Sequence, residues 1–115
     1  MHAAFEEKVQ IAQHGQVCVI TVRGEMDYDD SEAFQAAWDA ADRAALPTTA
    51  VDLTQVTFGD SMLLGALLNA RRRHEADGRD LILVGPLQPA VTRLLDVTGM
   101  RDYFTIADTG PAPIS

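Results

Sequence analysis

Apolar runs of strand length alternate along this chain with stretches that have the spacing of an amphipathic helix. The strand-like runs are VCVITVRG from residue 17, TTAVDLTQV from residue 48 and DLILVG from residue 80. Strands that alternate with helices favour a mainly parallel sheet whose connections are right-handed crossovers. The sequence therefore predicts an α/β fold.

Two further strand patterns complete the predicted sheet. In FEEKVQIAQ, residues 5–13, Val9 and Ile11 fall on one side, as in a strand with one buried face. The turn HGQ joins this segment to VCVITVRG as an antiparallel hairpin. Both alternating sets of the second strand are apolar, so we expect both of its faces to be covered. With YFTIA at 103–107 as the last strand, we expect a mixed, mainly parallel sheet of about five strands, the first antiparallel, with about three helices.

The first predicted helix follows the acidic stretch EMDYDDSE. Asp29, with Glu32 three residues later, is expected to cap the start of this helix, and Pro47 to end it. Its apolar stripe consists of Phe34, Ala37, Trp38, Ala41 and Ala45.

The second helix is expected to begin at Ser61, where SMLLGALL is followed by the polar stretch NARRRHEAD. We therefore expect it to be buried at its beginning and exposed at its end, with His74 in solvent. Gly78 fits the left-handed position that follows a last helical turn. A third, short helix is predicted in PLQPAVTRLLDVTG, which begins with prolines and stops at Gly99.

Length and charge limit the class of protein. The 115 residues fit one domain. We expect that domain to span residues 1–107, followed by a flexible C-terminal tail, 108–115, with two prolines and little to bury. The formal net charge of −8 argues against nucleic acid and anionic membrane surfaces as partners. No apolar run is long enough for a signal peptide or a membrane span, and the single cysteine, Cys18, cannot form an internal disulfide, so we expect a cytoplasmic protein.

Two loops of the predicted fold carry acids at the same edge of the sheet. In a parallel sheet, the loops that leave the carboxyl ends of the strands gather along one edge, where ligands and partners bind. Residues 24–30 and 58–61 are two such loops. If their strands are neighbours, Asp27 lies near Asp60 and Ser61.

Two enzyme-like alternatives for this edge lack a necessary residue. FGDSMLLG resembles the nucleophile block of the GDSL hydrolases, but a nucleophilic serine needs a positioned base, and no histidine follows His74. A receiver domain phosphorylated on aspartate would suit the acidic loop. Receivers, however, have a lysine late in the chain, and the only lysine here is Lys8. We therefore expect no catalytic residues.

The chain also lacks the usual patterns of a cofactor site. None of the eight glycines forms a G-x-G pair, and no G-x-x-x-x-G-K occurs. His2, His14 and His74 are far apart, and no His or Cys pair has the spacing of metal ligands. We expect neither a cofactor nor a bound metal.

Chemistry alone leaves two interpretations of Asp60 and Ser61. They can simply cap the helix that follows. Alternatively, Ser61 receives a phosphate, which the free N–H groups and the positive end of the helix dipole would stabilise. A phosphate adds about −1.5 to −2 charges to an already acidic edge, which would expel a partner that presents an acid there.

Four blocks of sequence follow one another along the chain: GEMD at 24–27, VDLTQVTFGDS at 51–61, DGRDLILVG at 77–85 and PAVTRLLDVTGMRDYF at 89–104. These blocks resemble successive blocks of the STAS domain, in the branch of bacterial anti-sigma factor antagonists, and the resemblance covers about residues 5–107. It implies a small switch protein that binds an anti-sigma factor, a serine kinase, and so releases a sigma factor. It also implies that the kinase phosphorylates Ser61, beside the acids Asp60 and Asp27, and that a phosphatase restores the complex.

The chain departs from the family pattern directly after the serine. The family usually continues Asp-Ser-Ser/Thr-Gly, whereas Met62 and Leu63 follow Ser61 here. Because the first helical turn protrudes at the carboxyl edge, we expect both to join Asp27, Asp60 and Ser61 in the partner-binding surface. The family also adds a final helix where this chain has DTGPAPIS. Two functions remain: an antagonist switched at Ser61, and a STAS protein-binding module in a signalling complex that is never phosphorylated.

Overall fold

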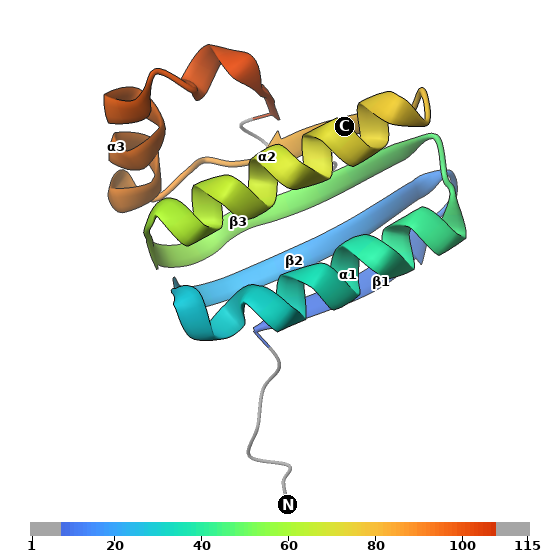
Figure 1. Cartoon of the computed structure of the whole chain (residues 1–115), viewed down its shortest axis with the longest axis horizontal. Coiled ribbons are helices and arrows are strands. Elements are labelled where there is room, and N and C mark those ends of the chain that lie inside the picture. The colour runs from blue at the N-terminus through green and yellow to red at the C-terminus, as the bar shows by residue number, and fades with distance from the viewer. Residues whose placement is uncertain (1–7, 108–115) are drawn as a thin grey trace, which may run out of the picture.

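The computed structural model of this protein describes residues 8–107, which form a five-stranded sheet with helices (Figure 1). The strands are β1 (Val9–His14), β2 (Val17–Met26), β3 (Thr48–Gly59), β4 (Asp80–Val84) and β5 (Thr105–Ala107). The helices are α1 (Ser31–Ala44), α2 (Ser61–Ala76) and α3 (Pro89–Thr98), with short 3-10 helices η1 (Tyr28–Asp30) and η2 (Arg101–Tyr103) before α1 and β5.

The strands lie in the sheet in their order along the chain, β1-β2-β3-β4-β5. β1 pairs with β2 antiparallel, and all other pairs are parallel. The predicted fold class and the predicted alternation of strands and helices are confirmed. The proposed tail, 108–115, and residues 5–7 of the first predicted strand lie outside the described residues.

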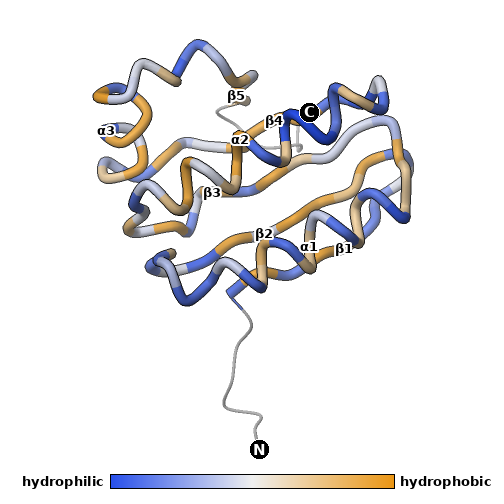
Figure 2. The backbone as a smooth tube through the Cα atoms, in the orientation of Figure 1, coloured by the Kyte–Doolittle hydropathy of each residue, from blue (hydrophilic) through white to orange (hydrophobic). Residues whose placement is uncertain are grey.

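Most of the core lies between one face of the sheet and the helices α1 and α2, which run side by side across that face (Figure 1), and Val91 and Leu95 of α3 extend it. On β2, Cys18, Ile20 and Val22 are buried there, whereas Val17 and Val19 on the opposite face are only half-buried. The prediction that helices or other segments cover both faces of β2 is therefore wrong for the second face. Figure 2 shows the resulting pattern, in which hydrophobic residues gather on the strands and recur at intervals along α1 and α2.

The start of α1 differs from the prediction. Asp27, rather than Asp29, acts as an N-cap, and it caps η1: its carboxylate accepts a hydrogen bond from the Asp29 N–H at 3.0 Å. The Asp30 carboxylate reaches back to the Asp27 N–H at 2.9 Å and so completes a capping box. Four acids in six residues offer several caps to the chain, and only the turn geometry selects one.

The end of α1 differs from the prediction at Ala45. The helix stops at Ala44, and Ala45 follows in the left-handed conformation with φ 54°. Ala45 is exposed there, so it is not part of the buried stripe, which consists of Phe34, Ala37, Trp38 and Ala41. Pro47 follows two residues after Ala45, where a proline that ends a helix is expected, as predicted.

Helix α2 has the predicted start and end but a different burial pattern. It begins at Ser61, and Gly78 takes the predicted left-handed conformation with φ 71°. The prediction of a buried beginning and an exposed end is wrong, because the inward side of α2 stays buried along its whole length, at Leu63, Leu67, Ala70 and His74. The amphipathic stripe continues through the charged half because Arg and Glu occupy its outward positions.

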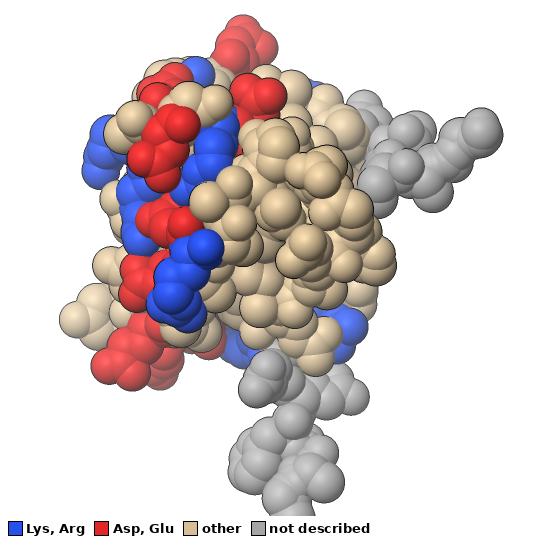
Figure 3. All heavy atoms as spheres, turned by 90° about the vertical axis from the view of Figure 1, so that its right-hand side faces the viewer, with Lys and Arg blue, Asp and Glu red and all other residues tan. Residues whose placement is uncertain are grey.

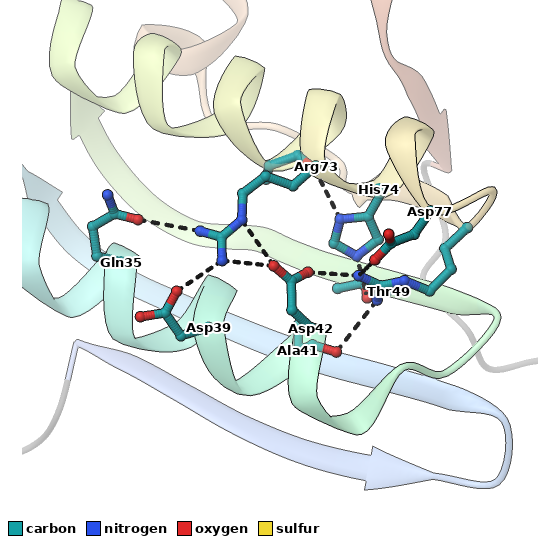
Figure 4. A network of polar contacts seen from close by, with 10 residues as sticks. Gln35, Asp39, Ala41, Asp42, Thr49, Arg73, His74 and Asp77 are labelled. Carbon is teal, nitrogen blue, oxygen red and sulfur yellow. Dashed lines mark hydrogen bonds and ion pairs between the residues drawn. The ribbon is translucent and has the colours of Figure 1, made fainter.

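His74 is 1% exposed, so the prediction that it lies in solvent is wrong (Figure 4). Its Nδ1 lies 2.8 Å from the Ala70 carbonyl oxygen and its Nε2 lies 2.7 Å from the Thr49 hydroxyl. Because a carbonyl only accepts, Nδ1 carries the proton and Nε2 accepts from Thr49. Burial lowers the pKa of the His74 imidazole and outweighs the hydrogen bond to the Ala70 carbonyl, which raises it; the nearby Arg79 guanidinium also lowers it.

An ion-pair network beside His74 joins α1 to α2 and to the start of β4 (Figure 4). Arg73 bonds Asp39 and Asp42 of α1, at 2.7 Å and 2.6 Å, and Arg79 bonds Asp42 and Asp77. Burial raises the pKa of the Asp42 carboxyl, but the hydrogen bonds and charges of Arg79 and Arg73 lower it more, so the net shift is downward. The network lies at the carboxyl end of α2.

Figure 3 shows that end of the molecule, where charged side chains crowd one side and leave a broad uncharged surface beside them.

Candidate functional site

Two loops meet at the opposite end of α2, where β2 and β3 end together. Met26, the last residue of β2, is the Cα partner of Gly59, the last residue of β3, in the parallel ladder. Asp27 directly follows β2 and Asp60 directly follows β3, so these two residues leave adjacent strands at the same level of the sheet. The predicted neighbourhood of Asp27, Asp60 and Ser61 follows from this register.

The first loop is an acidic turn closed by hydrogen bonds and an ion pair. Asp27 is exposed, and its carboxylate and N–H are both engaged in the capping box of η1. Lys8 pins the turn from the side, since its ammonium lies 3.2 Å from Asp30 Oδ2 and also donates to the Glu25 carbonyl oxygen. Tyr28, 77% exposed, projects from the same turn.

The second loop is the junction between β3 and α2. Asp60 is the N-cap of α2, and its carboxylate accepts the Met62 N–H at 2.9 Å while its carbonyl accepts the Leu64 N–H at 3.2 Å. Ser61 is the first residue of this 16-residue helix, and its side chain is exposed. The Ser61 hydroxyl therefore stands at the positive end of a long helix, with an acid on the preceding residue.

Met62 and Leu63 take different positions in the first turn of α2. Met62 is partly buried and lies at the edge of the core, beside the groove between α1 and α2. Leu63 is 0% exposed, so the expectation that it protrudes toward a partner is wrong. It points into the core and fills the space beside Gly59: a Cβ at residue 59 would lie 3.2 Å from Leu63 Cβ.

Sequence reasoning missed two contributions to this edge. Lys8 reaches the acidic turn because β1 is antiparallel and starts opposite the end of β2, which composition does not reveal. Phe58, near the end of β3, is 47% exposed instead of contributing to the core. In the sequence, its exposure is indicated only by its position one residue before Gly59, where β3 ends.

The described residues hold no arrangement for a metal. No group of three or more His, Cys, Asp or Glu side chains in residues 8–107 could hold an ion. Within the same residues, no helix has both the length and the apolar composition to cross a membrane. The side chains exposed at this edge include Asp27, Ser61 and the rings of Tyr28 and Phe58.

A five-stranded mixed sheet, two long helices on one face and a helix that begins at Ser61 and is capped by Asp60 together define a small α/β domain. The family model described as "Mlab, STAS domain" matches residues 9–107. The chain therefore belongs to the STAS domain family, as the four sequence blocks indicated.

Solved structures with this fold include proteins of known class. An anti-sigma factor antagonist from Mycobacterium paratuberculosis is 26% identical, with a TM-score of 0.74, over 89% of this chain and 86% of that chain. The phosphorylated form of the Bacillus cell fate determinant SpoIIAA is 24% identical, with a TM-score of 0.67, over 88% and 92%. An anti-sigma-factor antagonist (STAS) domain protein from Planctomyces limnophilus is 21% identical, with a TM-score of 0.72, over 89% and 90%.

Proposed function

We propose that this protein is an anti-sigma factor antagonist, which binds an anti-sigma factor and so releases a sigma factor. The anti-sigma factor is a serine kinase, and its phosphorylation of Ser61 ends the complex. A phosphatase then restores the binding form. The observation that carries this proposal is the exposed Ser61 at the start of α2, with Asp60 before it and Asp27 on the neighbouring strand end.

The comparisons support the partner class and the type of switch. The 26% identical protein from Mycobacterium paratuberculosis is an anti-sigma factor antagonist. SpoIIAA, which shares the fold, has been solved in both unphosphorylated and phosphorylated forms. Transferred to this chain, these properties make Ser61 the candidate acceptor, with Asp27, Asp60 and Met62 as the surface that a partner contacts. Leu63 is left out of this surface because it is buried.

The helix terminus supports phosphate at Ser61 on physical grounds. Helix N–H groups and the dipole stabilise an added anion, so phosphorylated Ser61 would not disrupt α2. The added charge acts instead on whatever faces Asp27 and Asp60. Two like charges about 7 Å apart at an effective dielectric of about 20 repel by roughly 2 kcal/mol per unit pair. The affinity of a partner that presents an acid at that position would fall by a factor of about 10 to 1,000.

The test is a kinase assay with the purified anti-sigma factor kinases of the source genome. The protein is incubated with each kinase and ATP, and its intact mass is measured, with Ser61→Ala as control. We expect one added phosphate with the kinase that binds, and none in the control. A kinase that binds the protein tightly yet adds no phosphate would contradict the switch.

The second candidate is a STAS protein-binding module that is never phosphorylated. The observation that favours it is the first turn of α2, where Met62 and Leu63 replace the usual hydroxyl and glycine. The leucine is accommodated in the core, but Met62 adds bulk beside Ser61. The same assay separates the two candidates, because only the first predicts a gain in mass.

A further inference from the structure

Helix α3 has apolar residues on two faces, of which one is buried in the core and the other is only partly covered. Val91 and Leu95 are buried in the core. Ala90, Leu94 and Val97 follow one another at i, i+4 and i+7 on a different face. On that face Leu94 is half-buried and Val97 is 74% exposed.

This outer face of α3 forms one wall of a groove beside the switch loop. The other wall is the end of β3, where Phe58 is 47% exposed. The lining is mostly apolar, and its volume of about 530 Å³ gives room for several side chains. Figure 1 shows α3 beside the end of β3 and near the start of α2. Phe58 and Val97 thus place two exposed apolar side chains in one groove, and apolar side chains that stand together on a surface favour an interaction site more than single ones do.

Arg93 gives this groove a charge preference. It is exposed at the groove, and no ion pair of Arg93 is found within residues 8–107. Lys8, Arg71, Arg73, Arg79 and Arg101 each have an acidic partner within these residues, whereas Arg23, Arg43 and Arg72, like Arg93, have none. Of these four arginines, Arg93 is the one that lines the groove. An exposed cation at the groove that has no acidic partner within residues 8–107 offers a position for a carboxylate from outside.

The groove is also continuous with the proposed switch. Gly59 belongs to its lining, and Asp60 and Ser61 are the next two residues. A protein that covers Ser61 and Asp60 would therefore lie next to Phe58 and the outer face of α3. A phosphate on Ser61 would stand at the border of the same contact area.

We infer that the groove between the end of β3 and α3 binds an amphipathic helix of the anti-sigma factor. Aliphatic side chains of that helix lie against Phe58, Leu94 and Val97, and an Asp or Glu pairs with Arg93. The inference rests on the proposed function for the identity of the partner. It adds a docking surface separate from the phosphorylated residue.

The experiment measures the affinity of the binding kinase, identified as above, by calorimetry for the wild type and three variants. Val97→Glu and Arg93→Glu change the groove, and Ile11→Glu is the matched control, because Ile11 is 43% exposed on β1 at the other edge of the sheet. Thermal unfolding of each variant checks that the fold is kept. We expect about a tenfold or greater loss of affinity for the two groove variants and less than twofold for the control. Replacing the Asp or Glu of the kinase that pairs with Arg93 by Arg or Lys should restore its binding to the Arg93→Glu variant.

Groove variants that bind like the control would overturn the inference. If phosphorylated wild type keeps its affinity while Val97→Glu loses it, the proposed switch fails and the groove stands. If phosphorylation weakens binding and the groove variants do not, the proposed switch stands and the inference about the groove fails. A wild-type dimer in sedimentation that Val97→Glu converts to a monomer would show that a second copy fills the groove, which overturns the choice of partner. If no kinase of the source genome binds, both the proposed function and the inference are overturned.

Discussion

Leu63 of α2 occupies the space that a side chain on Gly59 of β3 would need. An added Cβ at residue 59 would meet Leu63 at 3.2 Å from both its Cβ and its Cγ, and its Cδ2 would be closer still. The leucine that replaces the family's glycine is thus accommodated by a glycine four residues earlier. This close contact lies between the start of α2, which Ser61 begins, and the end of β3.

Gly59→Ala should destabilise the protein, because overpacking a filled core costs about 1–3 kcal/mol. Urea unfolding measures the change. Gly65→Ala is the control: a Cβ there meets nothing within 4 Å, and replacing a glycine inside a helix should raise stability by up to about 1 kcal/mol. Equal effects of the two substitutions would show that Leu63 does not restrict residue 59.

Ser61→Asp should weaken binding of the anti-sigma factor, and Ser61→Ala should preserve it. One added charge near a partner acid costs roughly 2 kcal/mol, or about 30-fold in affinity. Calorimetric titration of both variants measures the difference, and it should shrink as salt is raised from about 50 to 500 mM. Because aspartate carries less charge than phosphate, an unaffected Ser61→Asp would have to be compared with the enzymatically phosphorylated protein.

Acidification should destabilise the protein through His74. Burial lowers the pKa of His74 in the folded state, so the unfolded chain binds the proton more readily. Stability should therefore be fully present above the unfolded pKa of about 6.5 and fall as the pH drops below it, until the folded pKa is reached. Urea unfolding between pH 7.5 and 5 measures this slope. His74→Gln should reduce the slope even if it lowers stability overall, whereas a substitution of the exposed His14 should leave it unchanged.

Asp42 should give a second, separate loss of stability in stronger acid. Its pKa is lowered on balance by Arg79 and Arg73, although burial opposes them, so its contribution is present above the unfolded pKa of about 3.9 and is lost below it. Asp42→Asn should flatten the stability profile between about pH 4 and 2. Asp29, exposed on η1, provides the control substitution, and an equal flattening by Asp29→Asn would contradict the role of the network.

Ala45→Gly should stabilise the protein. Ala45 adopts φ 54°, a conformation that costs a residue with a side chain about 1 kcal/mol and a glycine little. We expect a gain of about 0.5–1 kcal/mol in urea unfolding. Ala44→Gly, at the last residue of α1, should instead lower stability by a similar amount.

The order of strands and helices could be predicted because it depends on local periodicity. The apolar alternation of β2 and the cap and end of α2, at Asp60 and Gly78, are all read within a few residues. The position of Asp27 beside Asp60 also followed, since consecutive parallel strands end at one edge.

The predictions that proved wrong concern positions where several residues of similar chemistry could fill the same role, or side chains whose burial depends on residues far away in the sequence. Asp29 was as good a cap as Asp27 until the turn geometry selected one. His74 looked solvated in a charged stretch, but Thr49 on β3 and the Ala70 carbonyl satisfy its two nitrogens in the interior. Leu63 was expected at the surface because nothing near it in the chain showed that Gly59 leaves room for it.

By itself, the sequence determined the α/β class, the STAS blocks and the acid–serine pair at the start of α2. These depend on short-range spacing, which is preserved when the chain folds. Only the tertiary structure decided which first-turn side chain is buried and that Lys8 reaches Asp30. It also decided that α3 turns Val97 outward beside Phe58. Such contacts join residues far apart in sequence, and their energies depend on which faces the sheet and helices turn toward one another.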